Sequence, residues 1–262
     1  MTSTFEKPSR RRTVLVTGAG SGLGRELCLH LAQNGFEIIV TDKDSDGADT
    51  TLSMLPKSQV GRAFELDVTR EENITRALRQ LENQNIDVLV NNAGLQHVAA
   101  LESFPQQRWD TLVDVMLRGA CLMTRSVLPS MRQRGYGRIV NIGSIHSLVA
   151  SPYKSAYVAA KHGLLGFAKV MALETANTDI TINTICPSYI RTPLVETQIA
   201  DQAKAHGIST DEVIEQIMLD PMPKKAFITS EEVAATITFL CSQHARNITG
   251  QQIVMDGGWT IK

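Results

Sequence analysis

Short apolar runs alternate with longer segments of helical periodicity along almost the whole chain. The short runs are rich in Val and Ile and several end in Gly, Asp or Asn, as buried strands do before a turn. The longer segments repeat apolar residues every three to four positions, the spacing of a helix with one buried face. The predicted strands are residues 13–18, 37–42, 62–68, 87–94, 137–144, 181–187 and 250–258. The predicted helices are residues 25–35, 46–55, 72–84, 106–134, 153–177 and 230–242.

Strand and helix alternate, which predicts parallel strands joined by helical crossovers. The expected α/β fold is a single-domain, Rossmann-type doubly wound parallel β-sheet flanked by helices on both faces. Residues 13–262 form that domain behind a basic N-terminal tail, residues 1–12. Ser230, followed by two acidic residues, is the expected N-cap of the last helix. The irregular, partly helical stretch 190–225 is expected as a lid over the substrate.

The composition and net charge of the chain argue against nucleic acid and membranes as partners. Hydrophobic residues make up 43% and charged residues 20% of the chain, and the formal net charge is -1, so neither nucleic acid nor an anionic membrane is favoured. No apolar run reaches the roughly 18 residues of a membrane span, and the basic start lacks the apolar segment of a signal peptide. The run of arginines at 10–12 is expected as part of a solvated tail.

The cysteines predict a cytoplasmic protein. They are far apart, form no C-x-x-C and have no histidine at metal-ligand spacing, so we expect reduced core thiols, no disulfides and no metal. The four are Cys28, Cys121, Cys186 and Cys241.

A glycine-rich segment, T-G-x-x-x-G-x-G at 17–24, joins the first strand to the first helix. Glycines there let backbone N–H groups approach a pyrophosphate, and the helix N-terminus adds partial positive charge. A purely structural turn is the alternative. The cofactor-binding residues expected in this loop are Gly18, Ser21, Gly22, Leu23 and Gly24.

Asp42, at the end of the second strand, bears on the identity of the cofactor. A carboxylate there accepts hydrogen bonds from ribose hydroxyls and repels a 2′-phosphate, which favours NAD over NADP. Lys43 and Arg25 are nearby cations that oppose this prediction, and Asp42 capping a turn is the other alternative.

Further cofactor residues follow the third and fourth strands. Asp67 and Val68 are placed to flank an adenine ring, and Asn91, Ala93 and Gly94 lie where the fourth strand ends. Ligands of open α/β sheets bind outside the carboxyl ends of the strands, so these segments are expected to meet in one crevice.

Tyr157 and Lys161 are four residues apart on a predicted helix and therefore share one face. Oxidising an alcohol needs a base for the hydroxyl proton while hydride leaves. Free tyrosine titrates near 10, and a nearby ammonium lowers its pKa. Taken alone, the pair is equally compatible with a surface contact.

Four motifs together resemble the short-chain dehydrogenase/reductase family: the glycine segment 17–24, NNAG at 91–94, Ser144 after a strand, and Tyr157-x-x-x-Lys161. The likeness extends from about residue 13 to 262. It implies that Tyr157 is the general acid/base, that Lys161 lowers the pKa of Tyr157 and holds the nicotinamide ribose, and that Ser144 hydrogen-bonds the substrate oxygen. The cofactor site implied by the family also takes in Tyr157, Lys161, Pro187, Ile190 and Thr192.

Segments such as Gln96-His97-Val98 and the stretch 154–163 resemble the D-3-hydroxybutyrate dehydrogenases within that family. This narrower resemblance implies oxidation of (R)-3-hydroxybutyrate to acetoacetate by NAD. It also implies a substrate site that holds a carboxylate, made of Gln96, His146, Lys154, Tyr189 and Gln198. The alternatives are a reductase for another carbonyl (3-oxoacyl thioester, sugar or steroid) and a weakly active NAD-binding sensor.

Two positions depart from the family's pattern. Met116 stands where relatives carry an Asn that supports a water next to the lysine, and a thioether is only a weak acceptor. Tyr189 stands where the hydroxybutyrate enzymes carry Trp.

The resemblance also implies a homotetramer built through the long fourth and fifth helices and the C-terminal strand. Apolar residues such as Leu112, Met123, Leu165 and Phe167 would serve that interface or the core.

Overall fold

The computed structural model describes residues 10–57, 61–81 and 84–261. Within these ranges the chain forms a seven-stranded sheet in the order β3-β2-β1-β4-β5-β6-β7, and every neighbouring pair is parallel. Each predicted strand is present, although most are shorter than expected. The strands are β1 (Thr13–Thr17), β2 (Glu37–Asp42), β3 (Gly61–Glu65), β4 (Val88–Asn91), β5 (Tyr136–Ile142), β6 (Asp179–Pro187) and β7 (Gln252–Met255).

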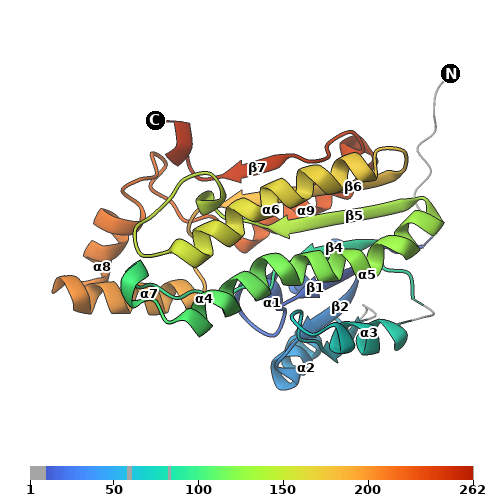
Figure 1. Cartoon of the computed structure of the whole chain (residues 1–262), viewed down its shortest axis with the longest axis horizontal. Coiled ribbons are helices and arrows are strands. Elements are labelled where there is room, and N and C mark those ends of the chain that lie inside the picture. The colour runs from blue at the N-terminus through green and yellow to red at the C-terminus, as the bar shows by residue number, and fades with distance from the viewer. Residues whose placement is uncertain (1–9, 58–60, 82–83, 262) are drawn as a thin grey trace.

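Helices lie against both faces of this sheet (Figure 1). One core packs α1 and α9 against the sheet, and a second core packs α3, α5 and α6 against the opposite face. The helices are α1 (Gly22–Gln33), α2 (Ser45–Met54), α3 (Glu71–Arg79), α4 (Gln106–Val113), α5 (Gly119–Arg134), α6 (Ser155–Glu174), α7 (Pro193–His206), α8 (Thr210–Val213) and α9 (Ser230–Leu240).

Side-chain alternation along β1 explains the two cores. Val14 and Val16 point into the first core and Leu15 into the second, and all three are fully buried. Successive residues of a strand face opposite sides, so a strand covered on both sides must be apolar throughout. The predicted doubly wound α/β fold is confirmed.

The strand order reverses beside β1, whose neighbours are β2 on one side and β4 on the other. At such a point the crossovers leave in opposite directions, and a crevice opens outside the carboxyl ends of the strands. The loops after β1, β2 and β4, which carry the glycine segment, Asp42 and NNAG, end at this crevice.

The long helix predicted over 106–134 is interrupted by a π-helical turn, η2 (Asp114–Arg118). The N–H of Gly119 donates to the carbonyl of Asp114 there, one residue farther back than in an α-helix. Such turns often occur at functional sites. Met116 lies within it and is buried.

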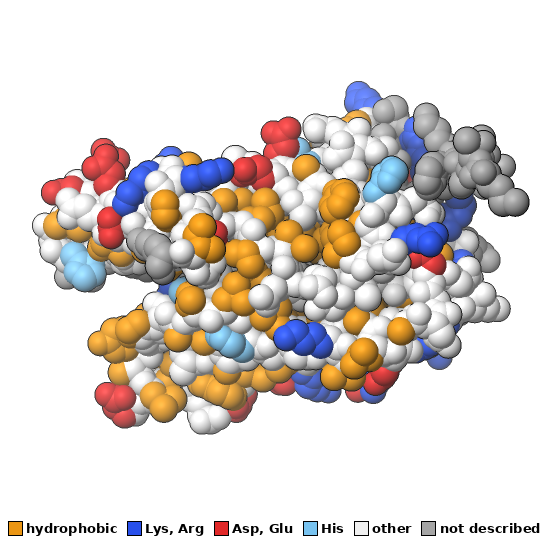
Figure 2. Space-filling model, turned by 90° about the horizontal axis from the view of Figure 1, so that it is seen from above, with side chains coloured by type: hydrophobic (Ala, Val, Ile, Leu, Met, Phe, Trp, Pro, Cys, Tyr) orange, Lys and Arg blue, Asp and Glu red, His pale blue; other side chains and the backbone are white. Residues whose placement is uncertain are grey.

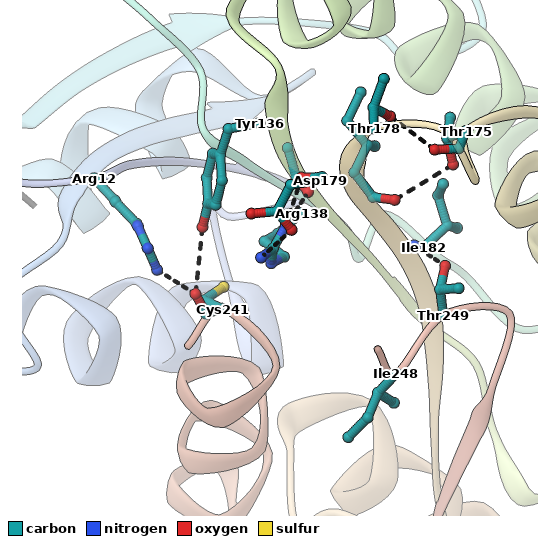
Figure 3. Close-up of polar contacts among 12 residues, drawn as sticks. Arg12, Tyr136, Arg138, Thr175, Thr178, Asp179, Ile182, Cys241, Ile248 and Thr249 are labelled. Atoms are coloured by element: carbon teal, nitrogen blue, oxygen red, sulfur yellow. Dashed lines mark hydrogen bonds and ion pairs between the residues drawn. The ribbon is translucent and has the colours of Figure 1, made fainter. Parts of the chain in front are cut away.

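A stacked group of side chains closes the amino ends of the strands (Figure 3). The Tyr136 ring lies between the guanidinium groups of Arg12 and Arg138, at 4.7 and 4.4 Å from its centroid. Arg138 is fully buried and pairs with Asp179 at 2.8 Å. Arg12 and the Tyr136 hydroxyl both donate to the carbonyl of Cys241. This group ties β5 to β6 and to the end of α9, far from the crevice.

The expectation of a solvated tail holds only in part at residues 10–12: Arg10 and Arg11 are exposed, but Arg10 and Arg12 are both bound to the folded chain. Arg10 makes a two-bonded ion pair with the buried carboxylate of Asp87, at 2.7 and 2.8 Å, and Arg12 belongs to the stack. A buried carboxylate requires such partners, which a local sequence pattern does not reveal. The rest of the predicted tail, residues 1–9, lies outside the described residues.

Other expectations also needed correction. The N-cap of α9 is Thr229, which forms a capping box with Glu232, so Ser230 is the first helical residue. Cys121 is exposed rather than a core thiol. Of the two alternatives left open for Leu112 and Met123, the structure selects the core, because both side chains are fully buried. No helix in the described ranges is both long and apolar enough to cross a membrane.

Candidate active site

A cavity of about 590 Å³ lies at the carboxyl ends of the strands. The molecule is hollowed at the end where α7 and α8 lie and toward which the strand arrows point (Figures 1 and 2). The cavity brings together every predicted site residue except Asn91. Its predicted lining residues are Gly18, Ser21, Gly22, Leu23, Gly24, Asp42, Asp67, Val68, Ala93, Gly94, Gln96, Ser144, His146, Lys154, Tyr157, Lys161, Pro187, Tyr189, Ile190, Thr192 and Gln198.

The glycine loop turns tightly between β1 and α1. Gly18 has φ +64°, a left-handed conformation that favours glycine, and a Cβ there would lie 2.7 Å from the Ala93 backbone. A Cβ on Gly24 would lie 2.2 Å from the carbonyl oxygen of Gly18. Gly22, at the start of α1, has open space around its Cβ position. The loop therefore leaves room at a helix N-terminus, as a bound pyrophosphate requires.

Asp42 is held in place beside that loop. Its carboxylate accepts hydrogen bonds from the backbone N–H of Gly20 at 2.8 Å and of Asp44 at 3.0 Å, and it lines the cavity. Lys43 also lines the cavity. Arg25 does not line the cavity, and its guanidinium donates instead to the carbonyl of Gly20 and to the Thr51 hydroxyl. Of the two opposing cations, only Lys43 borders the cofactor space.

NNAG joins the ends of β4 and β1. The Thr17 hydroxyl accepts from the backbone N–H groups of Asn92 and Ala93, and the Asn92 amide donates to the carbonyls of Thr17 and Gly18. Asn92 lines the cavity and was not predicted as a site residue. Its spacing within NNAG was visible, but its contacts depend on β1 pairing with β4.

Asn91 lies below the cavity rather than on its wall. It is 6% exposed, and its amide nitrogen donates to Asn141 at 2.9 Å and to Thr124 at 3.3 Å. Side chains alternate along a strand, so the residue before Asn92 faces the other side of β4. The predicted cofactor contact of its side chain is not part of this cavity.

The helix α6 and the strand β5 meet at the reacting centre. The Lys161 ammonium lies 5.5 Å from the centroid of the Tyr157 ring and donates to the carbonyl of Ile142 at 2.6 Å. Ser144 follows β5, and its hydroxyl accepts from the N–H of His146 at 3.1 Å. One helical turn separates the phenol from the ammonium, as the spacing predicted.

Burial dominates the titration of this centre. It raises the pKa of Tyr157, while a hydrogen bond with Ser144 acts in the lowering direction. Burial also lowers the pKa of Lys161 to about 8. The expectation that Lys161 brings the pKa of Tyr157 below its ordinary value is not met in the protein alone, because removal from water disfavours phenolate and ammonium alike.

A lysine and a histidine lie together on the substrate side. Lys154 Nζ is 3.5 Å from His146 Nε2, and both residues line the cavity. Burial, and then the charge of Lys154, lowers the pKa of His146 to about 4, so the imidazole is neutral at pH 7. Burial also lowers the pKa of Lys154. A bound group with negative charge would oppose the lowering of both pKa values, because it favours the protonated forms of Lys154 and His146. The pair is therefore a suitable partner for a carboxylate.

Two further residues at the site were not assigned from the sequence. The Trp259 ring packs 6.2 Å from the His146 ring and 5.9 Å from the Tyr189 ring, so it supports both. Trp259 follows β7, and only the return of the C-terminal segment to the site shows what its ring touches. Arg108, on α4, lines the cavity and is exposed. Nothing in its local pattern distinguishes it from other surface arginines.

The described residues contain no group of three or more His, Cys, Asp or Glu that could hold a metal ion. The donor set of the cavity instead fits a dinucleotide: a glycine loop at a helix N-terminus, a fixed carboxylate after β2, and an ammonium beside a phenol.

Comparison with known proteins agrees with this geometry. A family model for short chain dehydrogenases matches residues 12–203. The D-beta-hydroxybutyrate dehydrogenases of Rhizobium meliloti and Cupriavidus necator are 41% and 42% identical to this chain over 259 residues, which is 96% of it and 99% and 98% of theirs. A crystal structure of an actinorhodin polyketide ketoreductase variant with NADPH superposes with a TM-score of 0.90 at 31% identity, over 95% of this chain and 97% of that one. With the sheet order, the glycine loop and the Ser144, Tyr157 and Lys161 set in place, the chain belongs to the short-chain dehydrogenase family of oxidoreductases.

Proposed function

We propose that this chain is an NAD-dependent dehydrogenase of a small 3-hydroxy acid, which oxidises (R)-3-hydroxybutyrate to acetoacetate. The observation that carries the proposal is the Lys154–His146 pair, 3.5 Å apart in the same cavity as Tyr157. The similarity to two D-beta-hydroxybutyrate dehydrogenases supports it.

The proposed chemistry follows from the residues. Lys154 holds the substrate carboxylate, with His146, Gln96 and Gln198 as further hydrogen-bonding partners, and Ser144 donates to the 3-hydroxyl oxygen. The hydroxyl proton passes to the phenolate oxygen of Tyr157, which acts as general base. A nicotinamide cofactor held in this cavity would supply the two-electron acceptor for the hydride of C3, which leaves C3 as the ketone carbon. The charge of Lys161 favours the phenolate.

The preference for NAD rests on Asp42. A carboxylate fixed by two backbone N–H groups remains in the cavity and repels a 2′-phosphate, and Arg25 is occupied elsewhere. Asp67, Val68, Pro187, Ile190 and Thr192 also line the cavity. In this proposal Asp67 and Val68 flank the adenine ring, and all five belong to the cofactor site. In this proposal the segment 190–225, with α7 and α8, is the substrate lid, and residues 13–262 act as one catalytic domain.

The second candidate is a reductase for another carbonyl, since the ketoreductase similar in structure was solved with NADPH. Such substrates bring no carboxylate to Lys154 and His146. A weakly active sensor is a third possibility only if Met116 prevents turnover.

A spectrophotometric panel tests these proposals. NAD and NADP are each offered with (R)- and (S)-3-hydroxybutyrate and with secondary alcohols that lack a carboxylate. We expect NAD reduction with the (R) acid and at most weak activity with NADP. Reduction of NAD by the neutral alcohols but by neither enantiomer would refute the substrate, whereas NADH binding without turnover on any compound would favour the sensor.

We also propose a cytoplasmic homotetramer. Val170 and Leu173, on α6, are 53% and 79% exposed, and Phe239 and Val254, on α9 and β7, are 49% and 37% exposed. Apolar side chains of this size are common at subunit interfaces. Light scattering that gives the mass of a monomer would contradict the assembly.

A further inference from the structure

A second, small cavity lies directly beneath the first. It has room for the centre of one water molecule, about 10 Å³. Val115, Ile142 and Lys161 are among the residues that border both cavities, so the small one forms part of the floor below the reacting centre. Met116, in the π-helical turn, is buried beside it.

Lys161 has hydrogen-bonding capacity to spare at this place. An ammonium carries three N–H donors, and among the described residues the carbonyl of Ile142 is the one acceptor of its hydrogen bonds. A nicotinamide ribose held as the family resemblance implies takes a second donor. The third has no acceptor in the part of the chain that the structure describes, and Met116 offers only a thioether. A buried charge in this state is costly unless something accepts that hydrogen.

Asn91 has a buried acceptor that receives no hydrogen bond from the described residues. Its amide nitrogen is engaged by Asn141 and Thr124, while its Oδ1 is buried and accepts no hydrogen bond from the described part of the chain. Asn91 and Lys161 both line the small cavity. A buried polar atom without a partner in a polar cavity of this size is a common setting for an internal water.

We propose that this cavity holds one water molecule that accepts a hydrogen bond from the Lys161 ammonium and donates one to Asn91 Oδ1, which makes Asn91 a positioning residue for Lys161. The water stabilises the charged form of Lys161 and fixes its direction. Asn91 thus supplies, from the end of β4, the polar support that Met116 does not supply from η2. The inference rests on the catalytic roles given to Tyr157 and Lys161 under Proposed function.

The kinetic test measures kcat for alcohol oxidation against pH, whose acidic limb reports the titration of the Tyr157–Lys161 pair. Asn91→Leu removes the acceptor, so the ammonium is less stable and the limb moves about one unit to higher pH, an about tenfold loss of kcat on that limb. Asn91→Ser keeps a neutral polar acceptor, so its limb moves less than that of Asn91→Leu. An unmoved limb in a folded Asn91→Leu protein would overturn the proposal, and if that variant does not fold, the presence or absence of the water in a crystal structure decides it.

Thr124→Val is the matched control. It removes an acceptor of the Asn91 amide nitrogen while leaving Oδ1 free to bind the water, so the limb stays at its wild-type pH. A shift as large as that of Asn91→Leu would mean that general packing, not the water, controls Lys161. NADH affinity, followed by fluorescence, stays within about twofold in Asn91→Leu, since the side chain does not border the cofactor cavity. A tenfold loss would assign Asn91 to cofactor binding instead.

Two measurements separate this inference from the proposed function. A crystal structure of the wild-type protein is expected to show a water within hydrogen-bond distance of Lys161 Nζ and Asn91 Oδ1, and a dry cavity would refute the inference whatever the enzyme does. If Tyr157→Phe retains wild-type turnover, the catalytic roles fail and the inference about positioning fails with them.

A further variant tests whether the support at Lys161 is complete. If Met116→Asn raises turnover well above wild type, that support is incomplete, which contradicts the proposal.

Discussion

At the scale of single residues, burial determines the charges in this site. The imidazole of His146 is neutral at pH 7 because its pKa is lowered to about 4, and the pKa of Lys154 beside it is also lowered. Lys154 therefore carries the positive charge of the Lys154–His146 pair at neutral pH and loses it at a lower pH than an exposed lysine does. His146 contributes a hydrogen bond rather than a charge.

Lys154→Met is expected to raise KM for 3-hydroxybutyrate by about tenfold to a hundredfold, the value of a hydrogen bond to a charged group, with a smaller effect on kcat. Because Lys154 is charged below its pKa, the wild-type KM rises as pH increases through that lowered pKa, and the variant loses this dependence. Steady-state kinetics between pH 6 and 10 measure both. Lys169→Met, an exposed change on α6, is the control. A KM like that of wild type would remove Lys154 from substrate binding.

At the scale of elements, the loop before α6 stores strain next to the substrate pocket. Tyr153 has φ +66°, although it is not a glycine, and its side chain is 62% exposed. Its carbonyl accepts from the N–H of Ala99 at 3.0 Å, which ties this loop to the one after NNAG. The left-handed turn is followed at once by Lys154, so it helps to direct that side chain into the cavity.

Tyr153→Gly should stabilise the protein by about 1 kcal/mol, since a left-handed residue with a Cβ costs roughly that much more than glycine. Urea unfolding gives the free energy, and KM for the substrate should not change because the turn is kept. Tyr153→Ala keeps the strain and removes only an exposed ring, so its stability should stay near wild type. Equal stabilisation by both variants would show that the ring, not the backbone, is unfavourable.

At the scale of the whole molecule, the reacting centre lowers stability. The pKa of Lys161 falls from its ordinary value to about 8 on folding. Between pH 8 and the ordinary pKa of lysine the unfolded chain binds more protons than the folded one, so this group's contribution to stability rises with pH across that window and is unfavourable below it.

Lys161→Met should therefore be more stable than wild type at pH 7, by about 1–3 kcal/mol, and inactive. The difference should shrink as pH rises from 8 to 10, where the wild-type lysine becomes neutral in the folded state. Urea unfolding at several pH values measures it, with Lys169→Met as an exposed control. A destabilised variant at pH 7 would mean that the surroundings of the ammonium, including the proposed water, outweigh the cost of its burial.

The sequence by itself determined the architecture and most of the site. Apolar strands alternating with amphipathic helices specify a parallel sheet, and loops after parallel strands must meet at one edge, so the sequence predicts that Gly18, Asp42 and Gly94 lie near one another, as they do in the cavity. These features are local in the chain or follow from strand direction. The helix bounds and strand ends differed by a few residues, because capping depends on side-chain contacts such as Thr229 with Glu232.

Only the tertiary structure decided how burial and pairing act on these residues. The Asn91 side chain faces away from the cofactor cavity because side chains alternate along β4. Arg10 pairs with Asp87 because β1 and β4 are neighbouring strands. The pKa of Tyr157, expected to be lowered by Lys161 but raised by burial, has the same origin. A four-residue spacing predicts the ammonium beside the phenol, but the loss of water that governs both charges depends on everything packed around them.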